Sequence, residues 1–325
     1  MATLKVVVAT HGHCFDGLCS AAMFTRLLKH VHPNDTFEFS YRSMGYGPGQ
    51  NGVPPEVLAG DVNAILDYRF STSPKLTWYF DHHVSAFPDS LDRETYEERA
   101  HQNDRRVFHD GKYGSCTKLI ADIGASTFGL DSAPLAELIS WADMIDTASF
   151  PNAKMAVERD EPVLKLMTVV ESLGDDAFVS NMVPLLLLHP LKDIAHSEAV
   201  LKASDPLLKS HQSFVTMVGK FATEKGGVVV VDLTHENIEA AGKFVTYALY
   251  PESSYSVVLT KSKSKLKISI GYNPWSTKPR THNIAAICER HGGGGHPVVG
   301  AISFPVDKLA EAKAITEQIA AELRT

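Results

Sequence analysis

Short apolar runs alternate with helical patterns along the first half of the chain. The runs that predict strands are residues 4–10, 62–66 and 77–80. Apolar positions at helical spacing occur in residues 18–31, 116–123 and 135–145. Continuous runs rich in β-branched side chains are typical of strands buried on both faces of a parallel sheet. The alternation therefore predicts an α/β domain built on a parallel sheet, and the glycine- and proline-rich residues 41–55 predict a loop within it.

The pattern changes in the second half of the chain. Residues 163–221 are mainly helical, with predicted interruptions at Pro184, Pro190 and Pro206. A second α/β series follows, with strands at residues 228–232, 255–260 and 266–272 and helices at residues 283–290 and 309–323. We therefore predict an N-terminal domain at residues 1–160, a helical linker region at residues 161–222, and a smaller α/β domain at residues 223–325.

Composition narrows the class of protein. The chain has 325 residues, of which 44% are hydrophobic and 21% charged, as is ordinary for a soluble globular protein. Its apolar runs are too short to span a bilayer, and its first residues lack a secretory pattern, so we expect a cytoplasmic protein with no membrane role. The formal net charge of −7 argues against a protein that coats long nucleic acid, but it allows small phosphate-bearing substrates.

Acidic and histidine side chains follow the ends of the three predicted strands. The first strand is followed by His11 and Asp16, the second by Asp67, and the third by Asp81, His82 and His83. Ligands of parallel α/β sheets bind outside the carboxyl ends of the strands, where these side chains would converge. Converging carboxylates repel one another unless cations neutralise them, and mixed carboxylate and imidazole sets suit Mn²⁺, Mg²⁺, Fe²⁺ or Zn²⁺. The sequence therefore predicts a metal site, to which Asp143 is a fourth candidate contribution.

These residues resemble the motifs of the DHH phosphoesterase superfamily. Its first four motifs correspond here to His11…Asp16-Gly17, Asp67, Asp81-His82-His83 and Asp143. The run Gly292-Gly293-Gly294-Gly295-His296 resembles the GGGGH motif of the domain that commonly follows a DHH domain. The superfamily includes nanoRNases, phosphatases of 3′-phosphoadenosine 5′-phosphate, and exopolyphosphatase-related proteins. The resemblance implies a phosphoesterase with two divalent metal ions, most often Mn²⁺, which activate a water and neutralise phosphate oxygens.

The resemblance also implies a role for each motif residue. It implies that His11 and Asp16 bind different metals, that Asp67 bridges them, and that His82 binds the second metal. It also implies that Asp81 supports the second metal or binds it weakly, that His83 faces the substrate phosphate, and that Asp143 completes a metal site. His83 and Asp81 are thus the implied catalytic groups.

Cys14 departs from the family pattern. The superfamily usually has two aspartates in its first motif, two residues apart, and Cys14 stands in place of the first. A thiolate ligand would favour Fe²⁺ or Zn²⁺ over Mn²⁺. The alternatives are a weakened first site, a site in which His13 replaces the missing ligand, and an inert buried thiol.

The glycine run predicts a substrate-binding loop in the C-terminal domain. Without side chains, the backbone N–H groups of Gly293, Gly294 and Gly295 can approach a phosphate closely. We expect these glycines and His296 to contact substrate, and the resemblance adds Arg280 as a contact to a terminal phosphate.

The expected substrate is a small nucleotide or a very short oligonucleotide, cleaved at a phosphodiester or terminal phosphate bond. Two alternatives remain from the sequence: a hydrolase of inorganic phosphoanhydrides such as polyphosphate or pyrophosphate, and a nucleotide-binding protein whose metal site has decayed at Cys14. The sequence also leaves the oligomeric state open, and a homodimer is one possibility.

Overall fold

The computed structural model describes residues 3–46, 52–102, 104–237, 242 and 244–325. The chain forms two compact units, each made of two segments. Unit 1 comprises Met1–Ser149 and Glu161–Leu207, and unit 2 comprises Phe150–Asp160 and Leu208–Thr325. The chain therefore passes between the units three times, and the region expected to be a linker, residues 161–222, is divided between them.

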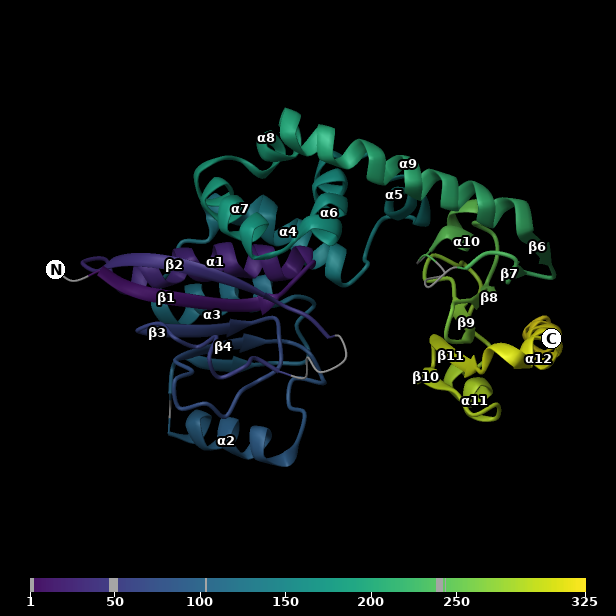
Figure 1. Cartoon of the computed structure of the whole chain (residues 1–325), viewed down its shortest axis with the longest axis horizontal. Helices are drawn as coiled ribbons and strands as arrows, with labels where there is room; N and C mark the ends of the chain where they lie inside the picture. The colour runs from purple at the N-terminus through teal and green to yellow at the C-terminus, as the bar shows by residue number, and fades with distance from the viewer. Residues whose placement is uncertain (1–2, 47–51, 103, 238–241, 243) are drawn as a thin grey trace. The chain divides into compact units, whose positions relative to one another are not determined.

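Unit 1 contains a five-stranded parallel sheet, which confirms the α/β class (Figure 1). Its strands are β1 (Thr3–His11), β2 (Thr36–Met44), β3 (Val62–Leu66), β4 (Trp78–Asp81) and β5 (Val107–His109). The order across the sheet is β2-β1-β3-β4-β5. Because all the strands run parallel, their carboxyl ends meet at one edge, as the sequence predicted.

Three elements of unit 1 were not predicted from the sequence. Strand β2 occupies part of the segment expected to be a loop, and its side chains are mostly half-buried or exposed because it lies at the sheet edge. Helix α2 (Ser90–His101) has no buried residue, so it lacks the apolar face that predicts a helix. Strand β5 is only three residues long. Residues 47–51, also within the predicted loop, lie outside the described residues.

The other helices of unit 1 pack on this sheet or on one another. They are α1 (Phe15–Val31), α3 (Cys116–Phe128), α4 (Ala136–Asp146), α6 (Pro162–Leu173), α7 (Asp176–Leu188) and α8 (Leu191–Ala195), with a short 3₁₀ turn η1 (Ala133–Leu135). Helix α1 is central: it packs on β1 and β3 and against α3, α4, α6 and α7. Small residues such as Gly17, Ser20 and Ala21 allow this close approach, and most of the helix is buried.

Two of the three predicted proline interruptions are wrong. Pro184 lies inside α7, and Pro206 lies inside α9 (Glu198–Phe221), which begins in unit 1 and ends in unit 2. Each proline removes one backbone donor, but the helix continues through it. Pro190 does separate two helices, since it is the N-cap of α8. Within the described ranges, no helix is long and apolar enough to cross a membrane.

Unit 2 contains a six-stranded mixed sheet of order β10-β11-β9-β8-β7-β6. The strands are β6 (Ala222–Lys225), β7 (Val228–Leu233), β8 (Tyr255–Lys261), β9 (Leu266–Tyr272), β10 (Gly294–His296) and β11 (Val299–Phe304). The helices are α5 (Ala153–Glu158), the end of α9, α10 (Val245–Leu249), α11 (Ile284–Glu289) and α12 (Leu309–Leu323), with a 3₁₀ turn η2 (Val306–Lys308). The pair β7–β8 is parallel and the other neighbours are antiparallel.

Both faces of the unit 2 sheet are covered. Val228 and Val230 belong to one hydrophobic cluster, and the alternate residues Val229 and Val231 belong to another, as the period of a strand requires. The second cluster also contains Val157 of α5, which explains why the segment Phe150–Asp160 belongs to unit 2.

Candidate metal centre

The acidic and histidine side chains meet at the carboxyl edge of the unit 1 sheet. Strand β1 ends at His11, β4 ends at Asp81, and Asp67 directly follows β3. The backbone N–H of Asp67 donates to the carbonyl of Phe80 (2.9 Å), which ties the end of β3 to β4. Asp67 also has a φ of 54°, a left-handed conformation that non-glycine residues adopt rarely and often at functional sites.

Asp67 lies at the middle of this cluster. Its carboxylate is buried, and within the described part of the chain neither oxygen has a hydrogen-bond partner. One oxygen, Oδ2, lies 3.7 Å from Nδ1 of His11, and the other, Oδ1, lies 3.4 Å from Nε2 of His82. A buried carboxylate whose two oxygens face two different imidazoles without hydrogen bonds is suited to bind cations on both sides.

Three overlapping groups in the described residues have the spacing of metal ligands. They are His11, Cys14 and Asp67; Asp67, His82 and His83; and Asp16, His82 and Asp146. Within each group the ligand atoms lie within 4.8 Å of one another. Two ligands that each bind a metal at about 2.1 Å lie roughly 3.0 to 3.4 Å apart at octahedral or tetrahedral angles. The separations of 3.2 to 3.8 Å between His82 and its carboxylate neighbours are therefore close to those of a metal shell.

The ring of His82 is oriented by the backbone. Its Nδ1 lies 3.1 Å from the carbonyl oxygen of Tyr113, to which it donates in the tautomer that leaves Nε2 unprotonated. Nε2 lies 3.2 Å from Asp146 and 3.8 Å from Asp16, and in the described part of the chain it has no hydrogen-bond partner. Metal-binding histidines commonly use one nitrogen for such a backbone contact and the other for the ion.

Asp16 is fixed by the N-terminus of another helix. Its two carboxylate oxygens accept the backbone N–H groups of Cys116 (2.7 Å) and Thr117 (3.0 Å), the first residues of α3. This contact explains how a fully buried carboxylate is tolerated, since a helix N-terminus stabilises negative charge. Gly17 makes the arrangement possible, because a Cβ there would overlap the carbonyl oxygen of His11.

The cluster contains more negative than positive charge. Burial and the carboxylates of Asp67 and Asp146 raise the pKa of Asp16 well above its usual range. Burial and Asp67 also raise the pKa of Asp146. Burial acts to lower the pKa of His82, but the surrounding carboxylates outweigh it and raise the pKa. Divalent cations would relieve this repulsion, so the residues present fit a metal centre.

Asp81 holds His83 and lies in none of the three ligand groups of the described residues. Its Oδ1 accepts a hydrogen bond from Nδ1 of His83 (2.7 Å), and its Oδ2 accepts one from the hydroxyl of Tyr79 (3.1 Å). Burial acts to lower the pKa of His83, but the Asp81 carboxylate outweighs it and raises the pKa. His109 of β5 bonds the carbonyl of His83 through Nε2 (2.8 Å), which fixes the backbone as well.

Cys14 lies in the cluster, and His13 does not. The thiol of Cys14 is partly buried and belongs to the group with His11 and Asp67. Burial and the charges of Asp67 and Asp16 raise its pKa, so a bound cation would be needed to hold it as a thiolate. His13 has an exposed side chain and lies in none of the three groups.

Asp146 occupies the place expected for Asp143. Asp143 lies in none of the described groups: it pairs with Nζ of Lys118 (3.2 Å) and accepts a hydrogen bond from Ser115 (3.3 Å). Asp146, three residues later, is the last residue of α4 and reaches His82. A carboxylate is unfavourable at the C-terminus of a helix, where Asp146 stands. An aspartate at the predicted end of this helix was therefore a sequence signal for Asp146 that the family motif does not include.

The glycine run of unit 2 forms part of a strand pair. Gly294–His296 is strand β10, which pairs with β11, and Gly294, Gly295 and His296 are exposed. Gly293 packs so closely on Ala301 and Ile302 that a Cβ would overlap their backbone. Arg280 bonds the carbonyl of Pro297 (3.1 Å), which places it beside the run. Its guanidinium also donates to the carbonyl of His282 (2.7 Å), so it is held at the residue that follows the run.

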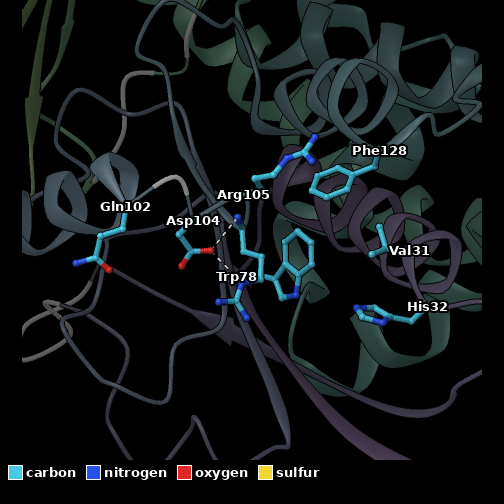
Figure 2. A pocket seen from close by; sticks show the side chains of 8 residues that line it. Val31, His32, Trp78, Gln102, Asp104, Arg105 and Phe128 are labelled. Atoms are coloured by element: carbon cyan, nitrogen blue, oxygen red, sulfur yellow. Dashed lines mark hydrogen bonds and ion pairs between the residues drawn. The ribbon is translucent and has the colours of Figure 1, made fainter.

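A cavity of about 570 Å³ lies elsewhere in unit 1 (Figure 2). Its lining includes Val31, at the end of α1, and Trp78, at the start of β4. Helix α1 begins and β4 ends at the metal cluster, so this cavity lies at the opposite end of the sheet and contains none of the candidate ligands.

No family model and no curated protein matches the sequence. Solved structures match nearly the whole chain. A pGpG-specific phosphodiesterase from Vibrio cholerae is 18% identical, with 98% of this chain and 99% of that chain covered and a TM-score of 0.64. An exopolyphosphatase-related protein from Bacteroides fragilis is 15% identical, with 98% and 92% covered and a TM-score of 0.52. RecJ from Thermus thermophilus in complex with Mn²⁺ is 14% identical, with 98% and 52% covered and a TM-score of 0.53. Another match is a DHH domain. The chain therefore has the fold of the DHH-family proteins, as its sequence motifs indicated.

Proposed function

We propose that the chain is a metal-dependent phosphoesterase that hydrolyses phosphodiester or terminal phosphate bonds of small nucleotides or very short oligonucleotides. The observation that carries this proposal is the buried Asp67 carboxylate, whose oxygens have no hydrogen-bond partner among the described residues and lie between His11 and His82. Such a set of anionic and imidazole ligands can hold the divalent ions with which many hydrolases neutralise phosphate oxygens.

Two ions fit the ligand groups. His11, Cys14 and Asp67 would hold one, and Asp16, His82 and Asp146 would hold the other, with Asp67 shared between them. Bound divalent ions would supply a water of lowered pKa and a positive charge for the phosphate oxygens. We expect Mn²⁺, with Fe²⁺, Zn²⁺ or Mg²⁺ as alternatives because Cys14 is a soft ligand.

Hydrogen bonds at Nδ1 orient the rings of His82 and His83. His82 directs Nε2 into the cluster because Nδ1 is held by the Tyr113 carbonyl. His83 is held at Nδ1 by Asp81, so its Nε2 remains for the substrate. A protonated His83, favoured by the neighbouring carboxylate, would donate a hydrogen bond to a phosphate oxygen and a proton to the leaving oxygen.

The comparisons support a small nucleotide substrate. The structure with the TM-score of 0.64 is described as a pGpG-specific phosphodiesterase. Hydrolysis of inorganic phosphoanhydrides is the second candidate, supported by the exopolyphosphatase-related structure. The exposed glycine run beside Arg280 favours the nucleotide, since polyphosphate requires no space for a base or ribose.

The test is a screen of metals against substrates. Metal-stripped protein would be supplied with Mn²⁺, Fe²⁺, Zn²⁺ or Mg²⁺ and assayed on dinucleotides, 3′-phosphoadenosine 5′-phosphate, cyclic dinucleotides and polyphosphate. We expect turnover of a nucleotide only with metal, and loss of turnover in Asp67→Asn. The matched control is Asp35→Asn, which alters another carboxylate paired with a histidine, His32, beyond the far end of α1. Turnover without metal, or unchanged turnover in Asp67→Asn, would refute the proposal.

A further inference from the structure

An exposed tyrosine stands beside the metal centre. Tyr46 follows β2, and its ring lies edge-on to the ring of His11 with 4.9 Å between the centroids. Although Tyr46 also touches other rings, it remains 42% exposed. A large aromatic side chain that faces solvent next to a candidate metal ligand is available to contact whatever the metals bind.

An arginine lies against the same ring. Arg69 follows Asp67 by two residues, and its guanidinium carbon lies 5.0 Å from the ring centroid of Tyr46. This distance is typical of a cation–π contact. The loops after β2 and β3 therefore bring an aromatic face and a positive charge together at the rim of the cluster.

Buried neighbours hold this pair in position. The fully buried Tyr68 packs its ring on Tyr46 with 4.7 Å between centroids, and its hydroxyl bonds the carbonyl of Gly45. On the other side, the backbone N–H of Gly12 donates to the carbonyl of Met44 (2.8 Å). The two residues before Tyr46 are therefore fixed by hydrogen bonds to the loops that follow β1 and β3. Because this backbone is already ordered, binding of a base would cost little conformational entropy there.

We infer that Tyr46 and Arg69 form a nucleotide-binding surface within unit 1, where Tyr46 stacks on a base and Arg69 pairs with a phosphate. The inference rests on the proposed function and deepens it, because it assigns recognition of the base to the unit that carries the metals. Base stacking on aromatic side chains tolerates any base, and the planar guanidinium of arginine matches phosphate geometry. The surface thus favours nucleotides over inorganic polyphosphate without selecting one base.

The position of Arg69 also addresses the charge of the site. The cluster around Asp67 is rich in carboxylates, and the metals alone would have to offset both these and the phosphates of a substrate. Arg69, held against Tyr46 next to His11, would add a fixed positive charge beside the cluster.

The test compares the binding of two substrate analogues. One is a phosphorothioate dinucleotide that resists hydrolysis, and the other is the same compound with abasic sugars. Dissociation constants would be measured by calorimetry with Mn²⁺ present, for Tyr46→Ala, Tyr46→Phe and Arg69→Gln. The matched control is Arg105→Gln, because Arg105 lies over the ring of Phe128 in a similar pair at the opposite end of the sheet (Figure 2).

We expect Tyr46→Ala to weaken binding of the base-bearing dinucleotide by roughly 5- to 100-fold and to leave the abasic analogue unchanged. Tyr46→Phe keeps the ring and should bind both like the wild type. Arg69→Gln should weaken both analogues, and Arg105→Gln neither. The bound metal, measured by mass spectrometry, should be the same in every variant.

Other outcomes would overturn the inference. If Tyr46→Ala binds the dinucleotide normally, or loses both analogues equally, the ring does not stack on a base. If it loses metal instead, the ring only supports His11. Metal-dependent hydrolysis with no preference for base-bearing compounds would leave the proposed function standing and refute this surface. Base-dependent binding without any hydrolysis would support the surface and refute the proposed function.

Discussion

Replacement of Asp67 by asparagine perturbs the metal centre with little change in shape. Asparagine has the same size and tolerates the left-handed backbone that Asp67 adopts, with a φ of 54°. It replaces one carboxylate oxygen with an NH₂ group, which is a poor metal ligand. Asp67 belongs to two of the three ligand groups, so the substitution should weaken both ions.

The expected effect follows from mass action. A metal at about 100 times its dissociation constant stabilises the folded protein by about 2.7 kcal/mol. For a unit of roughly 200 residues this raises Tm by about 5 to 11 °C. A residue that only orients ligands changes affinity by up to about 100-fold. If Asp67→Asn loses at least that much, the same metal concentration contributes about 0.4 kcal/mol or less, and Tm rises by no more than about 1 to 2 °C.

The assay is calorimetric unfolding of metal-stripped protein with and without Mn²⁺. Two further variants sharpen it, because Asp143 and Asp146 lie on the same helix and only Asp146 reaches His82. Asp146→Asn should lose much of the metal-induced rise in Tm. Asp143→Asn should keep it, since Asp143 pairs with Lys118.

If Mn²⁺ raised the Tm of Asp67→Asn as much as that of the wild type, Asp67 would not be a metal ligand. If Asp143→Asn lost the rise in Tm while Asp146→Asn kept it, the ligand would be Asp143, the residue that the sequence motif indicated, and not Asp146. Circular dichroism of the metal-free variants would verify that each is folded before metal is added.

Three further predictions concern neighbouring residues. Cys14→Asp should shift bound metal from Zn²⁺ or Fe²⁺ toward Mn²⁺ and Mg²⁺ in competition experiments, because a carboxylate replaces a thiolate; unchanged selectivity would mean that Cys14 is not a ligand. Gly17→Ala should lower the free energy of unfolding by about 1 to 3 kcal/mol, because its Cβ would overlap the carbonyl of His11; a stability equal to wild type in urea would contradict this. Asp81→Asn removes the charge that raises the pKa of His83. A histidine whose pKa is raised on folding stabilises the folded state at pH values below its unfolded pKa of about 6.5, and this stabilisation is lost as the pH rises through its folded pKa. The stability lost in Asp81→Asn, measured with a chelator present, should therefore be larger near pH 6, just below the reference pKa of about 6.5, than at about pH 9. A loss of stability that did not depend on pH would argue against the ion pair.

The predictability of each element follows its burial. The strands of unit 1 that are buried on both faces read as apolar runs, so β1, β3 and β4 were predicted within one or two residues. The edge strand β2 and helix α2, in which no residue is fully buried, lack such a signal. The assignment of Phe150–Asp160 to unit 2 depends on contacts distant in sequence, such as the bond from the Trp275 indole to the carbonyl of Phe150 (2.6 Å). No local pattern encodes them.

The candidate site shows the same division. Residues that directly follow strands, such as Asp67 and Asp81, could be placed at the sheet edge from the sequence, because strand direction fixes where they emerge. The choice between Asp143 and Asp146 depends on the rotation of α4, to which both contribute. The contacts of Asp81 were also open, since only the fold determines that it bonds His83 and Tyr79.

The interleaving of the two units has a consequence for biosynthesis. Phe150–Asp160 leaves the ribosome before the second segment of unit 1, Glu161–Leu207, and well before the rest of unit 2. The buried partners of Val157, among them Val215 and Val229, do not yet exist at that time. The segment must therefore stay undocked while unit 1 completes its own fold, and nascent chains halted before residue 208 should present it to chaperones and proteases as an open loop.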